Sequence, residues 1–114
     1  MPTTTTCGRA VPFNYSGSIE EGVTINHTSG DVPVRAEFFN SIIDQFRGQT
    51  VRGGFKMDDP PSNGLGWWVQ EHSAAQNGRR LTPRHGSFIA AILRDAGVLE
   101  CSMDGRSVVL KFKQ

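Results

Sequence analysis

The 114-residue sequence has only two cysteines and no long apolar run. Cys7 and Cys101 are far apart in the chain and fit neither a disulfide framework nor the ligand spacing of a zinc site. No segment approaches the roughly 20 apolar residues that a membrane-spanning helix needs. The first residues, Met-Pro-Thr-Thr-Thr-Thr, lack the apolar core of a signal peptide. We therefore expect a cytoplasmic protein without membrane contact.

Side chains that carry chemistry are also sparse and scattered. His27, His72 and His85 stand singly, and neither cysteine lies at ligand spacing from them, so we expect no metal and no other cofactor. A nucleophile, base and acid could be assembled from Cys101, His85 and Asp104. The pattern around Cys101 predicts that this side chain faces the core, however. The sequence therefore indicates a protein that is not an enzyme.

The length predicts a single domain. Residues 1–17 are rich in threonine, proline and glycine without periodicity, and we interpret them as a flexible N-terminal arm. The domain should then span residues 18–114, with its core in 33–114. Within 18–30, the alternation of Val23 and Ile25 with polar residues indicates at most one short strand.

Three helices are predicted from apolar residues at helical spacing. The first covers about 33–47 and ends before Gly48, the second covers about 64–75, and a short strand within 50–57 lies between them. A loop from Asp58 to Asn63 precedes the second helix. The third helix, 82–96, has the clearest signals: Thr82 as N-cap, Pro83 at the first helical position and Gly97 as the stop.

The chain closes with a predicted hairpin over residues 98–113. Two alternating runs flank Asp104-Gly105, a dipeptide typical of type I′ turns. With these two residues as the turn, Met103 pairs with Arg106 and Cys101 with Val108. The apolar members of both strands then lie on one face of the hairpin.

This order of elements, and above all the stretch from Leu81 to Leu99 that leads into the hairpin, resembles the winged helix-turn-helix superfamily. The resemblance covers residues 33–114. It implies an α+β, mostly helical fold, with a three-helix core and a C-terminal β-hairpin as the wing. It also implies nucleic-acid binding, with helix 82–96 in the major groove of double-stranded DNA and the hairpin on the backbone, as in a regulator of transcription.

The distribution of charge agrees with such a partner. Residues 1–77 carry five basic and eight acidic side chains, a net charge of −3, whereas residues 78–114 carry seven basic and three acidic ones, a net charge of +4. A surface of one sign steers polyanions towards itself. We expect base contacts from the start and outer face of the third helix, and phosphate contacts from the loop before it and from the hairpin. The predicted nucleic-acid-binding residues are Arg79, Arg80, Thr82, Arg84, His85, Ser87, Arg94, Arg106, Lys111 and Lys113.

Two alternatives stay open at this stage. RNA could replace DNA as the partner, and a homodimer on a two-fold DNA site would strengthen the weak binding expected of a domain with so small a net charge. A winged-helix domain can also serve as a protein–protein interaction module without nucleic acid. In that case the off-stripe Trp67 is the candidate anchor for a partner.

Overall fold

A four-stranded sheet forms the N-terminal part of the protein. The computed structural model describes residues 3–27, 30–57 and 61–114. The first four strands pair antiparallel in chain order, β1-β2-β3-β4. They are β1 (Thr3–Thr5), β2 (Pro12–Ser18), β3 (Gly22–His27) and β4 (Gly30–Val34).

Three helices and a second sheet follow. The helices are α1 (Ala36–Phe46), α2 (Leu65–Gln76) and α3 (His85–Asp95). The second sheet has the order β5-β7-β6, with β5 (Thr50–Arg52) on one edge and the terminal hairpin of β6 (Leu99–Asp104) and β7 (Ser107–Phe112) beside it. All of its pairings are antiparallel.

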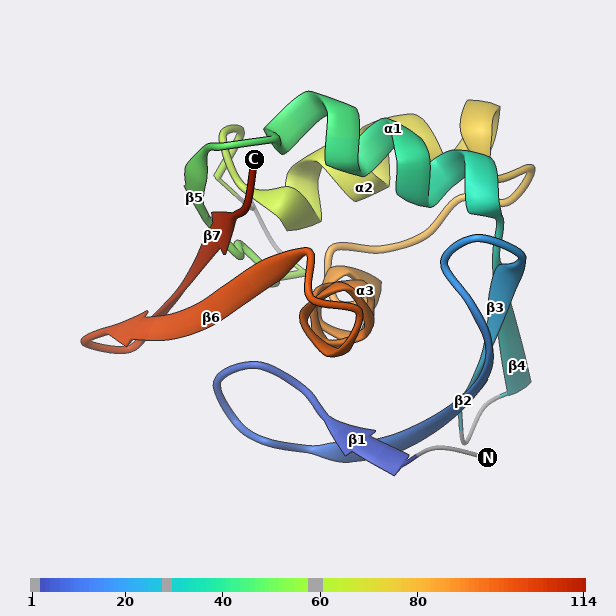
Figure 1. Ribbon diagram of the computed structural model, residues 1–114, viewed down its shortest axis with the longest axis horizontal. Helices are drawn as coiled ribbons and strands as arrows, with labels where there is room; N and C mark the ends of the chain where they lie inside the picture. The colour runs from blue at the N-terminus through green and yellow to red at the C-terminus, as the bar shows by residue number, and fades with distance from the viewer. Residues whose placement is uncertain (1–2, 28–29, 58–60) are drawn as a thin grey trace.

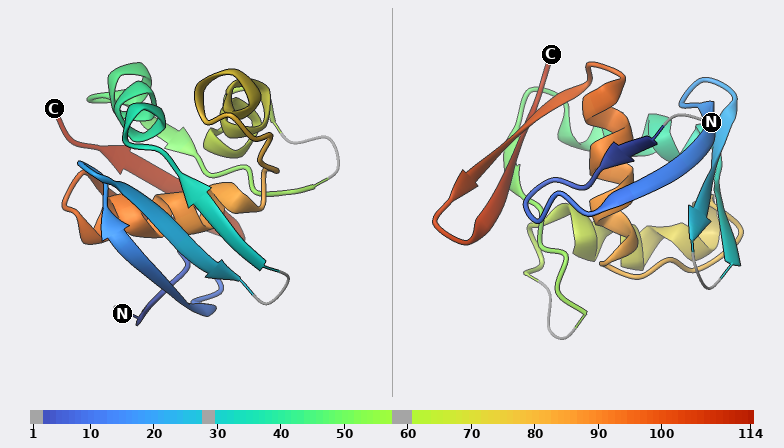
Figure 2. Two further views of the ribbon diagram at one scale, coloured as in Figure 1. Left: turned by 90° about the vertical axis from the view of Figure 1, so that its right-hand side faces the viewer. Right: turned by 90° about the horizontal axis from the view of Figure 1, so that it is seen from below.

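Helix α3 lies at the centre of the molecule (Figures 1 and 2). Strands β1 and β2 pass on one side of it, α1 and α2 lie on the opposite side, and β6 flanks it. Its residues Gly86 and Phe88–Leu93 are all buried. Phe88 meets Phe13 of β2 edge to face, with ring centroids 4.8 Å apart. One apolar core therefore joins both sheets and all three described helices around α3.

The predicted fold class is wrong. The chain is α+β with three helices and seven strands in its described ranges, and helix and strand contribute about equally, so the fold is not mostly helical. The difference arises from the N-terminal sheet. Its buried side chains alternate with half-buried or exposed ones, and Val23, Ile25, Val32 and Val34 pack into the core.

The flexible arm expected at residues 1–17 also differs from the structure. Within its described part, β1 and β2 pair with each other, and Thr3 stands opposite Asn14. Phe13 is buried against α3. Threonine is a β-branched residue that suits a strand, and one large aromatic side chain is enough to fix this segment on the core.

Several elements predicted within residues 33–114 are present. α1, α2 and α3 lie inside or within one residue of the predicted helices, β5 occupies the start of the predicted strand, and the terminal hairpin forms. The predicted loop at 58–63 falls partly outside the described residues. α3 begins at His85, because Thr82, Pro83 and Arg84 form a separate turn in which the His85 N–H donates to the Thr82 carbonyl at 3.0 Å.

The register of the terminal hairpin differs from the prediction. Asp104 pairs with Ser107, so the two turn residues are Gly105 and Arg106, and Met103 pairs with Val108. Gly105 has φ +63°, and the first central position is where type II′ turns take glycine. The change moves each pairing by two residues. Because side chains alternate with a period of two, the apolar face is the same in both registers, and the sequence pattern could not distinguish them.

Cys7 and Cys101 form a disulfide, which the sequence analysis did not predict. The bond joins the loop after β1 to β6, two segments 94 residues apart in sequence. Cysteine spacing predicts frameworks of several bridges and gives no sign of a single long-range one. The scarcity of cysteine is therefore no argument for a cytoplasmic location, which stays a prediction.

Two glycines allow the first turns of α2 and α3 to cross closely. A Cβ at Gly66 would meet the Gly54 carbonyl oxygen, and a Cβ at Gly86 would lie 3.3 Å from the Gly66 Cα. We expect Gly66→Ala to lower the free energy of unfolding by about 2 kcal/mol, although alanine favours helices by about 1 kcal/mol. Denaturant unfolding measures this, with Ala74→Gly on the exposed face of α2 as the control that costs about 1 kcal/mol. A Gly66→Ala protein more stable than wild type would contradict the packing described.

Candidate polyanion-binding surface

The loop between α2 and α3 alternates anchored and exposed residues. Asn77, Leu81 and Pro83 are buried, and the Leu81 N–H donates to the buried Ser73 Oγ at 2.6 Å. Arg79 and Arg80 lie between Asn77 and Leu81, and Arg84 follows Pro83 directly. All three arginines are exposed. The loop thus holds three guanidinium groups at the surface on a fixed backbone.

Asn77 connects this loop to the start of α1. Its Oδ1 accepts a hydrogen bond from the Arg35 N–H at 2.7 Å, and its Nδ2 donates to the Pro33 carbonyl at 3.0 Å. The guanidinium of Arg35 consequently lies against Gly78, where any Cβ would collide with it. Arg35 therefore joins Arg79, and we call the set Arg35, Arg79, Arg80 and Arg84 the arginine surface.

The loss of the two Asn77 hydrogen bonds is expected to cost more stability than two exposed hydrogen bonds would. In an Asn77→Ala protein the Arg35 N–H and the Pro33 carbonyl lose their partners in a partly buried place, so we expect a loss of about 2–3 kcal/mol in the free energy of unfolding. Asn77→Asp keeps the acceptor for the Arg35 N–H but faces the Pro33 carbonyl with a carboxylate oxygen, so it should be destabilised as well. Chemical denaturation of the three proteins measures this. Equal stability of Asn77→Ala and wild type would show that the loop is not anchored here.

Two imidazoles lie near the arginines: His85 at the start of α3 and His27 at the end of β3. His85 Nδ1 accepts a hydrogen bond from the Thr82 N–H at 3.0 Å and lies 3.1 Å from Thr82 Oγ1. A bond from a backbone N–H to the side chain three residues further on corresponds to one half of a capping box. The rings of His85 and His27 have centroids 6.4 Å apart. Burial lowers the pKa of His85, and the charges of His27, Arg79 and Arg84 lower it further.

The lowered pKa of His85 predicts how the stability of the protein changes with pH. A folded-state pKa below the unfolded value of about 6.5 means that the unfolded chain takes up the proton first as pH falls. The contribution of His85 to stability is therefore present above about pH 6.5 and is lost as pH drops below it. Denaturant unfolding at pH 7.5 and pH 5.5 measures the difference. His85→Gln, which keeps an acceptor for the Thr82 N–H, should show a smaller difference; a difference equal to that of wild type would contradict the role of His85.

The arginine surface carries unneutralised positive charge. Among the described residues, the ion pairs lie elsewhere, at Asp44–Arg47, Arg52–Asp104 and Arg94–Asp95. None of the four arginines pairs with a carboxylate in the described part of the chain, and Arg79 donates only to the backbone carbonyl of Asp31, at 3.3 Å. Among the described residues, the positive charge of these four guanidinium groups is therefore not balanced by a carboxylate.

Arg94, predicted to read bases, is instead engaged inside the protein. Its guanidinium donates to Thr4 Oγ1 at 2.9 Å, to the Thr5 carbonyl at 2.8 Å and to Asp95 Oδ1 at 3.2 Å. Ser87 is half-buried, and its hydroxyl donates to the Arg84 carbonyl. Arg94 therefore lies away from the arginine surface, and the Ser87 hydroxyl is engaged by the backbone of Arg84. The outward position predicted for Arg94 did not take account of the strands that cover this side of α3.

Burial of α3 also excludes the expected major-groove contact along its length. Ala90 and Ala91 are fully buried. Gly86 packs against Phe55 and Gly66. Small residues permit close approach of any neighbour, and here the neighbours belong to the same protein. Only the first turn of α3 borders the arginine surface.

The hairpin residues Arg106, Lys111 and Lys113 lie apart from the arginine surface. In Figures 1 and 2 the hairpin tip and the loop between α2 and α3 point to opposite sides of the molecule. Lys111 stands opposite Glu100 in the register of β6 and β7. Arg52 on β5 forms an ion pair with Asp104 of β6 at 3.9 Å. The basic residues of the last 37 positions therefore do not converge on one face as predicted.

Trp67 lines a separate shallow groove. The groove has a volume of about 610 Å³ and lies between the end of α1, the strand β5 and the start of α2. Its walls mix amide and apolar side chains, including Gln45, Gln49 and Asn63. Trp67 is half-buried there, as expected for a side chain off the core-facing stripe of its helix.

Comparison of the chain with protein-family models, curated proteins and solved structures found no match. The resemblance to winged-helix domains therefore stays a prediction. Among the described residues no helix is long and apolar enough to cross a membrane. The same residues contain no group of three or more histidine, cysteine, aspartate or glutamate side chains that could hold a metal ion.

Proposed function

We propose that the protein binds nucleic acid through its phosphate backbone at the arginine surface. The observation that carries this proposal is that Arg35, Arg79, Arg80 and Arg84 lie together on an anchored loop and helix start without a carboxylate partner among the described residues. Guanidinium groups form paired hydrogen bonds with phosphate oxygens. Because the backbone of the loop is already anchored, binding has to order the arginine side chains but not the loop itself.

The proposed contact is with phosphate rather than with bases. Four arginines that each neutralise one phosphate of duplex DNA give a log–log salt slope of about −3.6. The positive end of the α3 dipole lies beside Arg84 and favours the same negative charge. Because no exposed helix face accompanies the arginines, we expect weak binding with little dependence on sequence. A second copy of the chain bound nearby would raise the affinity by linking two such surfaces.

A titration with three probes tests this function. Fluorescence anisotropy of a random DNA duplex, a DNA single strand and an RNA duplex is measured at 50 mM and 200 mM salt. We expect all three to bind, with an affinity for the DNA duplex lower by roughly 100-fold or more at the higher salt. Binding that does not change between the two salt concentrations contradicts the proposal. Saturable binding of an acidic peptide in the absence of nucleic-acid binding would establish the protein-interaction alternative instead.

We also propose that the protein is not an enzyme and that it resides in the cytoplasm. The cytoplasmic location can be tested through the disulfide of Cys7 and Cys101, because cytosolic thiols are generally kept reduced. Alkylation of the protein in freshly lysed cells, followed by mass measurement, shows whether the two cysteines are reduced or disulfide-bonded in the cell.

A further inference from the structure

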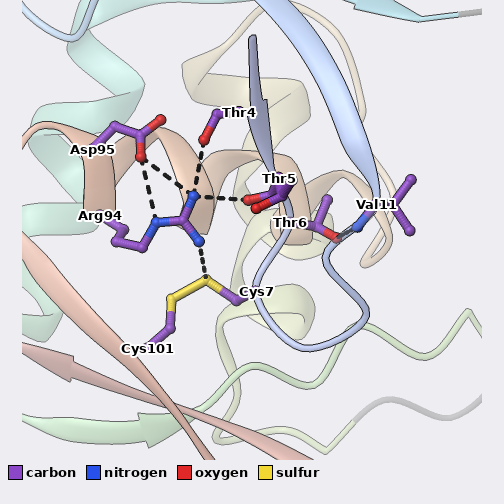
Figure 3. The surroundings of a disulfide bond; sticks show 8 residues. All are labelled: Thr4, Thr5, Thr6, Cys7, Val11, Arg94, Asp95 and Cys101. Carbon is purple, nitrogen blue, oxygen red and sulfur yellow. Dashed lines mark hydrogen bonds and ion pairs between the residues drawn. A yellow bond between two sulfur atoms is a disulfide. The ribbon is translucent and has the colours of Figure 1, made fainter.

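The disulfide joins the loop after β1 to strand β6, and its two cysteines differ in their surroundings (Figure 3). Cys7, in the loop after β1, is only 6% exposed, whereas Cys101 on β6 is partly exposed. The loop packs on the terminal hairpin, where a Cβ at Gly8 would meet Val108 and Met103. The two sulfur atoms therefore differ in their access to solvent and in their neighbours.

A guanidinium group contacts one of the two sulfur atoms. Arg94 Nη1 lies 3.8 Å from Cys7 Sγ, and the same guanidinium is fixed by hydrogen bonds to Thr4, Thr5 and Asp95 (Figure 3). In the described part of the chain, no basic side chain donates a hydrogen bond to Cys101 Sγ. A cation beside a cysteine stabilises its thiolate over its thiol. Negative charge is thus better accommodated on Cys7 than on Cys101.

We infer that Cys7–Cys101 is a thiol–disulfide exchange site, at which a dithiol reductant attacks Cys101 Sγ and Arg94 stabilises the departing Cys7 thiolate. In the first step a sulfur–sulfur bond forms between the reductant and Cys101, and the Cys7–Cys101 bond breaks with its electron pair going to Cys7. In the second step the other thiolate of the reductant attacks its own bonded sulfur and releases Cys101. The protein gains two electrons, and the reductant becomes a disulfide.

Both partial steps agree with the geometry. Attack requires access, which favours the partly exposed Cys101 over the buried Cys7. Exchange is faster when the departing sulfur is the more stable thiolate, which favours Cys7 beside Arg94. The same arrangement thus directs the reductant to one sulfur and helps the other to leave.

The loop around Cys7 has hydrogen bonds that hold its conformation without the disulfide. The Thr6 N–H donates to the Val11 carbonyl at 2.9 Å, and the Val11 N–H donates to Thr6 Oγ1 at 3.0 Å. These bonds close the loop independently of the disulfide, and Arg94 holds β1 beside it. The thiols therefore stay close after reduction, so that an oxidant can re-form the bond.

Trapping the first step identifies the sulfur that is attacked. The oxidised full-length protein is treated with a monothiol, glutathione, acid-quenched at early times and mapped by peptide mass. We expect the mixed disulfide at Cys101, with Cys7 free. An adduct mainly at Cys7, or equal amounts on both cysteines, would overturn the inference.

The role of Arg94 has a separate measurement. We expect Arg94→Met to slow reduction by dithiothreitol on the order of tenfold. Thr4→Val removes one hydrogen bond of the guanidinium but keeps its charge, and it should leave the rate within about twofold. Loosening of β1 alone would instead speed reduction in both variants, and that result contradicts the inference.

A readout that needs no access to the sulfur completes the test. In Cys101→Ser the thiolate absorbance of Cys7 is followed in the ultraviolet against pH, and in Cys7→Ser that of Cys101. Cys7 should ionise at lower pH than Cys101, and Arg94→Met in the Cys101→Ser protein should remove that difference. Identical titrations with and without Arg94 would show that the guanidinium does not stabilise the thiolate.

Discussion

Replacing Arg79, Arg80 and Arg84 together with glutamine is expected to weaken binding to duplex DNA on the order of 100-fold at moderate salt. Each lost contact between a guanidinium and a phosphate costs at least about 1 kcal/mol, and three such contacts amount to about two decades of affinity. The fold should persist, because all three side chains are exposed and make no ion pair in the described part of the chain. Fluorescence anisotropy with a random duplex measures the loss, and circular dichroism checks the fold.

The hairpin supplies a control with the same change of charge. Arg106, Lys111 and Lys113 are also exposed and basic, and their replacement with glutamine lowers the net charge by the same three units. Because these residues lie on the other side of the molecule, we expect the affinity for DNA to stay within about threefold of wild type. If both triple variants lost affinity equally, binding would depend on net charge alone, and the arginine surface would have no special role.

Reduction of the disulfide is expected to lower the free energy of unfolding by about 4.5 kcal/mol. Cys7 and Cys101 close a loop of 94 residues in the unfolded chain, and the entropy of closing so long a loop corresponds to that value. A domain of this size has a total stability of about 5–15 kcal/mol, so this loss would remove between about a third and nearly all of it. Urea unfolding with and without a dithiol reductant measures the difference.

The double variant Cys7→Ser, Cys101→Ser separates the bond from other effects of the reductant. Its stability should match that of the reduced wild-type protein and should not change when the reductant is added. A difference of less than about 1 kcal/mol between oxidised and reduced wild-type protein would show that the bond constrains the unfolded chain very little. This equilibrium result is independent of the rates that the exchange mechanism predicts.

Elements with local signals could be predicted from the sequence, and those that depend on distant pairing could not. The helices carry apolar residues at helical spacing, and glycines at positions 48 and 97 mark their ends. The N-terminal strands instead contain threonine, asparagine, serine and glycine, which are equally common in loops. Their stability comes from pairing with one another and from the packing of Phe13 against Phe88 of α3, which lies 75 positions further along the chain.

The burial of α3 could not be predicted from the sequence either. Ala90, Ala91 and Gly86 are small, and smallness suits a helix that approaches DNA as well as one enclosed by its own protein. The sequence could not decide between them, because the covering strands were not recognised. Arg94 was therefore assigned to a DNA-reading face, although it binds Thr4 and Thr5 of β1.

The candidate site was predicted in part. Of the ten residues expected to bind nucleic acid, five come together around one loop: Arg79, Arg80, Thr82, Arg84 and His85. Arg35 was missed, because it lies 42 positions from Asn77, whose side chain places it there. An asparagine at the end of a helix is a common cap signal and does not reveal a bond to a distant segment. Contacts of this kind require the folded chain.

The salt dependence of DNA binding, measured for wild type and for the Arg79, Arg80 and Arg84 triple variant, tests the central claim most directly. Four phosphate contacts predict a slope of log affinity against log salt of about −3.6 for wild type, and one remaining contact predicts about −0.9 for the variant. Slopes close to these values would locate the ionic contact at the arginine surface. A slope that is the same in both proteins, or near zero in wild type, would contradict the account.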